Sequence, residues 1–585
     1  MAIVGIDLGT TKSAVAVLRG NGPEIIPNHE GDRITPSVVG LSKAGELWIG
    51  KRPKESRLVL KDGPVEEVKR LMGSTERLTF NGRDRSPQEI SSYILRALKS
   101  DAEAFLGEKV NCAVITIPAY FNEPERRATR EAGELAGLYV GAVLDEPTAA
   151  ALAYGLGKTD DQTILVYDLG GGTFDVSILE VADNHFEVLG ISGNKRLGGK
   201  DFDRRLSKWV IDQVKQKHGV DLAADRRAMH KVVLAVEKAK KELSSSPQTG
   251  ILIEAATPDL DVDLTISRAQ FEALIKDYID STIPCIEEAL DKAELMSKEI
   301  DKVVLVGGST RIPGVQSVVR KYFSKEPLRD INPDEAVALG AAIFTSILGE
   351  DVKKKFIPAA KMEEYELKDA QGEVIKPVAV PRTPHALGIG LAENKLAVIL
   401  EENSFYPISV TRKEFGTVSD DQPELEVPVY EGRNPVATEN TPLGIVHLDL
   451  PDGLRRGSPV WVTFTLNDSR ILEVTVEIPN AKTKAKATAV IKGTSDLDPE
   501  ERERIIREAR EAIGARSPIE MAKALLREGE DTLEMNKGKI AGPKASAIER
   551  QLLTLRAAIE AMDSSLIDKA CTELTRLLRD VRYTL

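Results

Sequence analysis

The chain has 585 residues, of which 42% are hydrophobic and 29% are charged, with a formal net charge of -13 at pH 7. It is too long for one hydrophobic core, so we expect roughly three to four domains. The acidic balance argues against a nucleic-acid binder, which would carry a basic surface. The three cysteines are scattered without a CxxC pair, which excludes a disulfide framework and a cysteine-based zinc site.

The chain shows no targeting or membrane segment. Its N-terminus enters an apolar strand at once, without the basic and apolar regions of a signal peptide. No run of about 18 apolar residues occurs, so we expect no membrane span. Scattered thiols are typical of a reducing compartment. These features predict a cytoplasmic protein.

The first motif is GIDLGTTKSAVAV, residues 5–17. Its apolar residues predict two strands joined by the turn DLGTTK. That turn offers an unobstructed backbone at Gly9, hydroxyls at Thr10 and Thr11, a carboxylate and an ammonium. These groups suit an anionic ligand with a metal ion, although the motif alone is equally compatible with a plain hairpin.

Two later stretches repeat this pattern. TILVYDLGGGTFDVSILEV (163–181) is again a strand, an acid-glycine turn and a strand, and KVVLVGGSTRIPGV (302–315) runs from a strand through a Gly-Gly-Ser-Thr turn towards a helix. Glycine lets backbone N–H groups approach phosphate oxygens, and hydroxyls add donors. Neither GxxxxGK[ST] nor the Rossmann glycine pattern is present. Three such turns predict a duplicated domain that closes on one phosphate ligand.

Eight motifs, in their order and character, resemble those of the seventy-kilodalton heat-shock chaperones, the DnaK family. They are GIDLGTTKSAVAV, ITIPAYFNEPERRATREAGELAGL, DEPTAAALAYGL, DLGGGTFDVS, LGGKDFD, EKAKKELSS, VGGSTRIPGVQ and NPDEAVALGAAI. The resemblance covers 1–350, is weaker to about residue 495 and is loose beyond it. It implies a multidomain protein with an α/β ATPase of the actin and sugar-kinase type in two lobes, then an antiparallel β sandwich, then an α-helical lid.

The resemblance and the composition together predict four parts. These are a nucleotide-binding ATPase domain over 1–350, a linker over 351–384, a β-sandwich peptide-binding domain over 385–495 and a helical lid over 496–585. Alternating apolar and polar residues support the sandwich. Asp498 followed by Pro499 indicates the start of a lid helix.

The linker range departs from the family. It is rich in lysine, glutamate and proline. The family's linker is a short aliphatic run that docks as a strand and couples the domains. We find no such run here, only Phe356-Ile357-Pro358, so altered coupling or a remodelled strand is expected.

The resemblance also implies the catalytic and metal residues. Lys69, in EEVKRLMG, resembles a lysine that orients the attacking water and stabilises charge on the phosphoryl group. Asp7 and Asp168 are expected to hold Mg²⁺ through its waters. The catalytic candidates are Lys69, Glu146, Asp168, Thr173 and Asp175.

The nucleotide itself is assigned to the three turns and one helix. EKAKKELSS predicts four polar side chains on one helical face. Lys12, Lys200 and Lys241 stand where the family usually has other residues, and K⁺ is left open as a further cation. The expected ATP or ADP contacts are Gly9, Thr10, Thr11, Lys12, Gly170, Gly171, Gly172, Gly199, Glu237, Lys240, Lys241, Ser244, Gly307, Gly308, Ser309, Arg311 and Asp334.

Two further sets of residues concern coupling and peptide binding. Pro118 in IPAYF and Arg126 in NEPERR resemble the family's proline switch and its arginine partner, with Glu146 relaying nucleotide binding to the proline. YEGRNPVATENTPLG resembles a motif of the peptide-binding domain. Matching through it predicts an apolar groove, although ordinary sandwich core is equally compatible. The groove residues are Leu396, Phe415, Val418, Leu425 and Val427.

One turn of the sandwich departs from the family pattern. Arg470 stands where the family's turn carries glycine. The hairpin around Arg470 must therefore differ from the family's hairpin.

The resemblance implies an ATP-dependent chaperone that couples slow Mg-ATP hydrolysis to binding and release of extended hydrophobic peptide segments of unfolded proteins. A nucleotide exchange factor and a J-domain cochaperone are the implied partners. J-domain-responsive relatives usually carry a basic pair near Gly141 and Ala142, so a weakened or dedicated J-domain partner is expected.

Two alternative functions stay open. One is a specialised paralogue whose β domain holds a single native partner. The other is a sugar or acetate kinase on the same clamp, which would have no use for a β domain and a lid. The 385–495 segment discriminates against the kinase.

Overall fold

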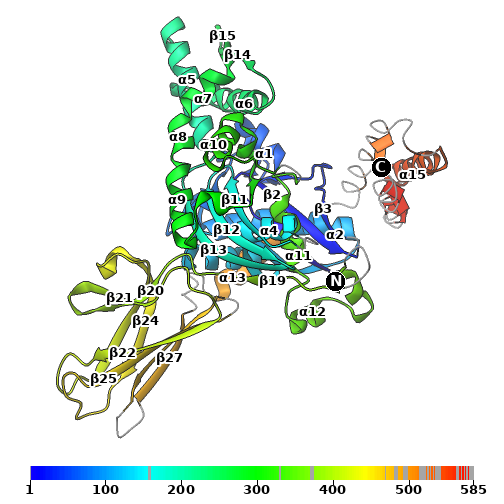
Figure 1. Ribbon diagram of the computed structural model, residues 1–585. Helices are drawn as coiled ribbons and strands as arrows, with labels where there is room; N and C mark the ends of the chain where they lie inside the picture. Colours follow the sequence, from blue (N-terminus) through cyan, green and yellow to red (C-terminus); the bar gives the residue numbers. More distant parts are fainter. Residues whose placement is uncertain are drawn as a thin grey trace.

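Two α/β lobes form the body of the molecule, with a pair of β sheets beside them and helices at the C-terminal end (Figure 1). The computed structural model describes residues 2–20, 22–155, 160–328, 331–368, 374–467, 470–479, 485–491, 499–512 and 542–561, and short stretches between 522 and 578.

The first lobe is built on a mixed sheet with strand order β10-β9-β1-β2-β3, and β4 also pairs with β2. Strand β1 runs antiparallel to β2 and parallel to β9. Its apolar residues are buried on both faces because helices cover the sheet. The bounds are Ala2–Asp7 (β1), Lys12–Arg19 (β2), Gly22–Ile26 (β3), Thr35–Pro36 (β4), Val110–Ile117 (β9) and Tyr139–Asp145 (β10).

Helices and small hairpins complete the first lobe. Helix α3 begins with a capping box in which Asn122 and Glu125 satisfy each other's backbone N–H groups, and a proline occupies its first turn. Helix α11 packs against α4 and β1. The bounds are Lys51–Glu55 (α1), Pro87–Leu106 (α2), Glu123–Leu135 (α3), Glu146–Gly155 (α4), Ala336–Phe344 (α11), Val39–Leu41 (β5), Leu47–Ile49 (β6), Leu78–Phe80 (β7) and Arg83–Arg85 (β8).

The second lobe repeats the plan with strand order β16-β11-β12-β13-β19. As in the first lobe, its leading strand, β11, pairs antiparallel with the next strand and parallel with a later one, β16. The sheet's bounds are Gln162–Leu169 (β11), Phe174–Ala182 (β12), His185–Asn194 (β13), Lys302–Val306 (β16) and Val378–Val380 (β19).

Helices and a hairpin of the second lobe form the upper part of Figure 1. The hairpin β14–β15 packs on α6. The bounds are Gly199–His218 (α5), Arg226–Leu243 (α6), Arg268–Leu274 (α7), Lys276–Asp280 (α8), Thr282–Ala293 (α9), Pro313–Phe323 (α10), Gln248–Thr257 (β14) and Leu260–Ser267 (β15).

The segment expected to be a linker carries ordered elements. They are Glu350–Phe356 (α12), a 3-10 helix at Ala359–Tyr365, Leu367–Lys368 (β17), Val374–Ile375 (β18) and β19. Strand β19 pairs parallel with β13, with His185 opposite Val378. The prediction that this range lacks a strand-forming aliphatic run is therefore wrong. Prolines flank Val378–Val380, but β19 lies at the sheet edge, where proline is tolerated. Phe356 instead ends a helix and is buried.

The β sandwich consists of two antiparallel four-stranded sheets, with strand orders β21-β20-β23-β24 and β22-β25-β26-β27. Alternate residues of β25 and β26 face a common apolar core. The bounds are Leu387–Leu391 (β20), Lys395–Leu400 (β21), Ile408–Gly416 (β22), Glu424–Glu431 (β23), Thr441–Asp449 (β24), Pro459–Leu466 (β25), Leu472–Ile478 (β26) and Ala485–Ile491 (β27).

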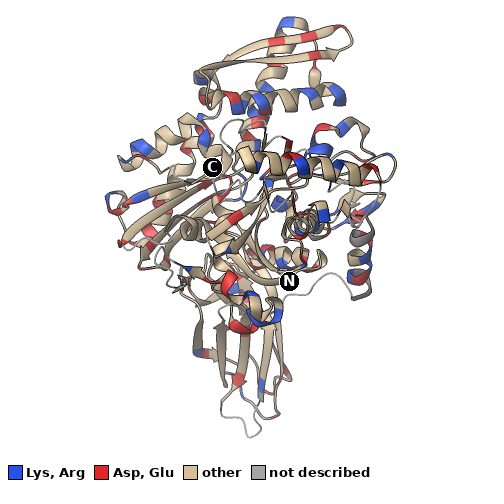
Figure 2. Cartoon of the chain, turned by 90° about the vertical axis from the view of Figure 1, so that its right-hand side faces the viewer, with Lys and Arg blue, Asp and Glu red and all other residues tan. Residues whose placement is uncertain are grey.

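Two C-terminal helices are described, Pro499–Ala512 (α13) and Gly542–Glu560 (α15). Pro499 opens α13, whereas the expected cap at Asp498 lies outside the described residues. Ile505 of α13 packs against Leu135 of the first lobe. None of the helices in the described ranges has the length and apolar character needed to cross a bilayer. Acidic and basic residues are interspersed along the ribbon (Figure 2).

Candidate nucleotide site

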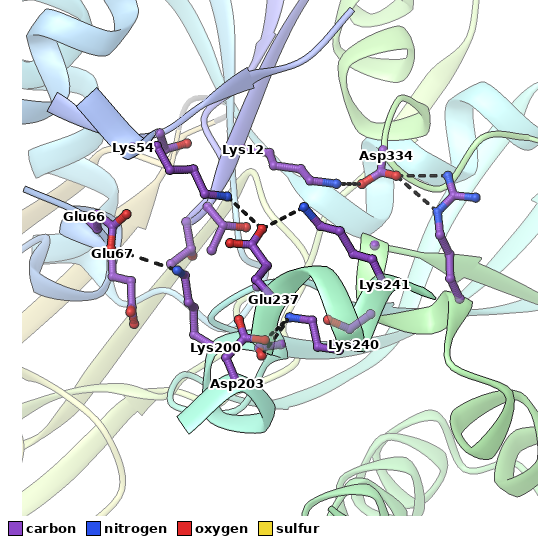
Figure 3. Close-up of a pocket in the computed structure, with 18 of the residues that line it drawn as sticks. Lys12, Lys54, Glu66, Glu67, Lys200, Asp203, Glu237, Lys240, Lys241 and Asp334 are labelled. Atoms are coloured by element: carbon purple, nitrogen blue, oxygen red, sulfur yellow. Dashed lines mark hydrogen bonds and ion pairs between the residues drawn. The ribbon is translucent and has the colours of Figure 1, made fainter. Parts of the chain in front are cut away.

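A cavity of about 270 Å³ lies between the two lobes (Figure 3). Its walls come from the β1–β2 turn, the start of α5, one face of α6 and the turn after β16. The expected nucleotide contacts that line it are Thr10, Thr11, Lys12, Gly171, Gly199, Glu237, Lys240, Lys241, Ser244, Gly308, Ser309, Arg311 and Asp334. The structure thus gathers residues from six separate motifs around one space.

A second cavity, of about 70 Å³, adjoins the first and shares the β1–β2 turn with it. The expected catalytic and phosphate residues that line this cavity but not the first are Asp7, Gly9, Lys69, Glu146, Asp168, Gly170, Thr173 and Gly307. Asp175 and Gly172 line neither cavity. Asp175 is nevertheless buried close by, because it directly follows the second turn on β12.

Buried carboxylates dominate the floor of the site. Burial, reinforced by the charge of Glu146, raises the pKa of Asp7 to about 7 and that of Asp175 to about 8. The pKa of Asp168 is also raised well above its ordinary value, first by burial and then by the neighbouring carboxylates. The Lys69 ammonium, 3% exposed, forms an ion pair with Glu146. Because a single ammonium faces several buried carboxylates, the site can accommodate a further cation.

The first two turns fit into one another. A Cβ on Gly171 would lie 2.2 Å from Oγ1 of Thr11, and one on Gly172 would lie 2.3 Å from Cγ2 of Thr10. Each threonine therefore occupies space that a side chain in the other lobe would need. The glycines of the second turn are required by this close approach of the two lobes.

The α6 residues form a charged wall that reaches across the cleft. Glu237 pairs with Lys54 of the first lobe at 2.7 Å and with Lys241 at 2.8 Å. Although burial favours the neutral carboxyl, these two ammonium groups lower the pKa of Glu237. Lys240 bonds Asp203 at 2.8 Å and the carbonyl of Gly199 at 3.0 Å. The wall therefore fixes the start of α5 beside the cavity.

The third turn closes the opposite side. The Ser309 hydroxyl donates to the carbonyl of Gly170 at 2.7 Å, which ties the third turn to the second. Asp334 accepts from Lys12 at 2.8 Å and from Arg311 at 2.9 Å. These two ion pairs lower the pKa of Asp334 against the effect of its burial. Asp334 thus holds two cations at the cavity rim.

The two residues expected to act as a switch lie outside both cavities. Arg126 is buried and bonds Asp145 and the carbonyl of Val143. Pro118 follows β9, and its carbonyl accepts the N–H of Phe121 at 3.2 Å. No direct bond joins Pro118 to Arg126 in the described residues, so the proline-switch role stays a prediction.

The expected groove residues fall on both sheets of the sandwich. Val427 is buried in the core, whereas Val418 is 60% exposed in the loop after β22. Phe415 and Leu425 are half-buried against the core, and Leu396 is half-buried on β21. This set therefore includes both buried core residues and exposed or half-buried residues. The peptide groove stays a prediction.

Two cross-cleft residues were missed from the sequence. Arg70 donates to the carbonyl of Gly172 at 2.7 and 2.9 Å and pairs with Asp201 at 2.7 Å. Lys54 reaches Glu237 from α1. Arg70 stands beside Lys69 in KRLMG, but a charged pair in sequence gives no sign of which member crosses the cleft.

The donor set fits a nucleotide with a hydrated divalent cation. The described residues include no group of three or more His, Cys, Asp or Glu side chains placed to grip a metal ion directly. Mg²⁺ keeps several waters and takes only one or two carboxylates, which matches acids gathered round a small cavity. Hydroxyls, glycine backbone and lysines beside that cavity suit phosphate oxygens.

Comparison with known proteins covers nearly the full length of the chain. The family model described as Hsp70 protein matches residues 3–79 and 74–584. A chaperone protein DnaK from Thermotoga neapolitana is 40% identical over 576 residues, which is 96% of this chain and 93% of that protein. The matched range includes both lobes, the sandwich and the C-terminal helices. The chain therefore belongs to the Hsp70 family.

Proposed function

We propose that the two-lobed domain hydrolyses Mg-ATP slowly and that its nucleotide state sets the grip of the β sandwich on extended apolar peptides. Membership of the Hsp70 family makes the chain an ATPase and an ATP-dependent chaperone. The observation that carries the finer proposal is the set of turns from both lobes, joined with the α6 face around one cavity. The strand β19 connects this domain to the sandwich.

In this proposal the phosphates lie against the turns of both lobes. The hydroxyls of Thr10, Thr11 and Thr173 donate to phosphate oxygens, together with backbone N–H groups of the glycines. Mg²⁺, when bound, supplies charge that offsets the phosphate oxygens, with Asp7 and Asp168 holding its waters. The nucleoside lies along the α6 face, where Glu237 and Lys240 are held in place.

Hydrolysis then depends on positioning and charge. Lys69, held by Glu146 at the floor, stabilises negative charge that develops on the transferring phosphoryl group. Asp175 orients the attacking water from the second lobe. A cytoplasmic address and exchange of nucleotide by a separate factor are parts of the same proposal.

A peptide-library binding assay with the full chain tests this function. We expect peptides rich in apolar residues to exchange faster with ATP than with ADP. Identical affinities and exchange rates in both nucleotide states would contradict the proposed coupling. Selection of one native protein with no peptide binding would instead favour a specialised paralogue.

Thermal unfolding tests the metal-dependent nucleotide site separately. Mg-ATP is expected to raise the melting temperature, because a ligand that binds only the folded protein stabilises it. EDTA should abolish the shift. A shift that persists undiminished without Mg²⁺ would count against the carboxylate site.

The proposed J-domain partner is dedicated or weakly bound. Gly141 and Ala142 of β10 offer no positive charge, whereas an arginine would add a charge-assisted bond to an acidic partner. We expect weak stimulation of ATPase by a generic J-domain protein and stronger stimulation of Ala142→Arg. Full, saturable stimulation of the unmodified chain at micromolar concentration would contradict this expectation.

A further inference from the structure

One segment of the second lobe is held at both ends by the first lobe. This bridging segment, residues 195–201, leads from β13 into the first turn of α5. At its start, Nζ of Lys195 donates to Oε2 of Glu125 in α3 at 2.5 Å. At its end, Oδ2 of Asp201 accepts from Nη2 of Arg70 at 2.7 Å. Both ion pairs therefore join one lobe to the other.

The acid in each of these ion pairs also caps a helix. Oε2 of Glu125 accepts the N–H of Asn122 at 2.7 Å, which closes the capping box of α3. Oδ2 of Asp201 accepts the N–H of Gly198 at 2.8 Å, at the start of α5. Such N–H groups have no partner inside their own helix. A cation from each lobe thus binds the capping carboxylate of a helix in the other lobe.

The middle of the bridging segment contacts the second turn of the nucleotide site. The N–H of Gly199 donates to the carbonyl of Gly170 at 3.0 Å. The N–H of Lys200 donates to the carbonyl of Gly171 at 2.9 Å. A Cβ on Gly198 would lie 2.5 Å from the carbonyl carbon of Gly171. Because the backbones pack this closely, a shift at either end of the segment moves the second turn.

Arg70 also connects the bridging segment to the proposed charge stabiliser. The 3-10 helix Val68–Leu71 carries Lys69 and Arg70 as neighbours. Lys69 pairs with Glu146 in the first lobe, whereas Arg70 donates to the carbonyl of Gly172 in the second lobe at 2.7 Å. The helix is only one turn long, so the contacts of Arg70 also fix where Lys69 lies.

The residue before this 3-10 helix has an unfavourable backbone conformation. Glu67 has φ 55°, in the left-handed region that non-glycine residues rarely adopt. Its carboxylate accepts from Arg70 at 2.9 Å and from Arg204 of the second lobe at 2.8 Å. Conformations of this kind persist where the surrounding contacts over-determine them. Arginines from both lobes therefore hold the start of the helix that carries Lys69.

We propose that Arg70 and Lys195 are positioning residues for ATP hydrolysis, which hold the bridging segment between the lobes and so keep the second turn and Lys69 in register. Neither side chain lines either cavity. The Arg70 side chain is 13% exposed and that of Lys195 is 31% exposed, so solvent screens the lysine more and its effect is the smaller. The proposal rests on the proposed function, because it places the transferred phosphoryl group between the two turns.

Single-turnover hydrolysis at saturating ATP tests this role. Arg70→Met should lower the rate at least about tenfold, and Lys195→Met at least about threefold, because small displacements of reacting groups are costly. ATP affinity should change less than threefold. Arg70→Lys should recover only part of the rate, since an ammonium lacks the guanidinium fork. Arg196→Met is the matched control, because Arg196 is exposed in the same segment, and its rate should be unchanged.

Two double-mutant cycles show whether the ion pairs carry the effect. Glu125→Gln and Asp201→Asn keep an oxygen that can accept the capping N–H, so α3 and α5 stay capped. If each pair acts as a unit, Lys195→Met with Glu125→Gln should be no slower than the slower single variant, and likewise Arg70→Met with Asp201→Asn. Losses that simply add in both cycles would overturn the proposal.

Hydrogen–deuterium exchange of the full chain, with and without Mg-ADP, tests the bridging segment independently of activity. Amides of 198–201 should exchange at least about tenfold faster in Arg70→Met in at least one of the two conditions, while amides of 206–214 in α5 stay protected. Unchanged exchange in both conditions, or an unchanged hydrolysis rate, would overturn the proposal. Failure of the unmodified chain to bind or hydrolyse ATP would overturn the proposed function, while the exchange experiment would still decide whether the first lobe holds the segment.

Discussion

The turn between β1 and β2 and the turn between β11 and β12 have the same topology but use different parts of the chain. In the first turn the side chains of Thr10, Thr11 and Lys12 line the cavity. In the second turn the backbone makes the contacts: the carbonyl of Gly170 accepts from Ser309, and that of Gly172 accepts from Arg70. The two lobes thus share one fold, but the first turn uses its side chains where the second uses its backbone.

The difference follows from the close approach of the lobes. Thr10 and Thr11 can line the cavity only if the opposite turn leaves room for their methyl groups, and Gly171 and Gly172 leave that room. The two turns also differ in how they connect to the sandwich. Asp175, next to the second turn, receives the Tyr120 N–H beside the sandwich contact of His385.

The largest expected effect comes from removing Lys69, which lines the smaller cavity and forms an ion pair with Glu146. Lys69→Ala should lower single-turnover hydrolysis by about 10²-fold or more, since one charge stabiliser is lost, and leave ATP binding nearly intact. Rapid-quench measurement of ATP cleavage checks this. Unchanged turnover would remove Lys69 from the mechanism.

The next effect tests whether the lobes need the glycines. Gly171→Ala places a methyl group 2.2 Å from Oγ1 of Thr11, so we expect ATP affinity to fall by about 10-fold or more, in line with the cost of overpacking. Gly250→Ala is the matched control, because a Cβ there meets nothing within 4 Å. Titration calorimetry measures both, and equal affinities would show that the approach of the lobes does not require glycine at position 171.

A smaller effect tests the lysine peculiar to the first turn. Lys12 is 40% exposed and paired with Asp334, so its charge is partly screened by solvent. Lys12→Asn should weaken ATP binding only a few-fold, and the difference should shrink as salt rises. A loss as large as that of Gly171→Ala would show that the first turn depends on this side chain.

Much of the site was accessible from the sequence because three similar turns occur in it and because the family resemblance assigned roles to individual residues. Residues of the three turns and of the α6 face do meet round one cavity. Arg70 and Lys54 were not found, because their partners lie across the cleft, at Gly172 and Glu237, and no local pattern specifies such pairs. The Val378–Val380 strand was missed because the lysine, glutamate and proline content of 351–384 was interpreted as that of a linker, whereas proline beside a strand is tolerated at a sheet edge.

The edge strand β19 also affects how readily the chain can associate with other extended segments. Strand β13 would present a row of unpaired N–H and C=O groups if β19 were not paired with it. Such an edge is a template for any extended segment, including one from another molecule. The connection between the two main domains therefore also covers the edge of the second lobe's sheet. A release of the sandwich that carried β19 away would leave the β13 edge unpaired and able to pair with another extended segment for as long as the release lasted.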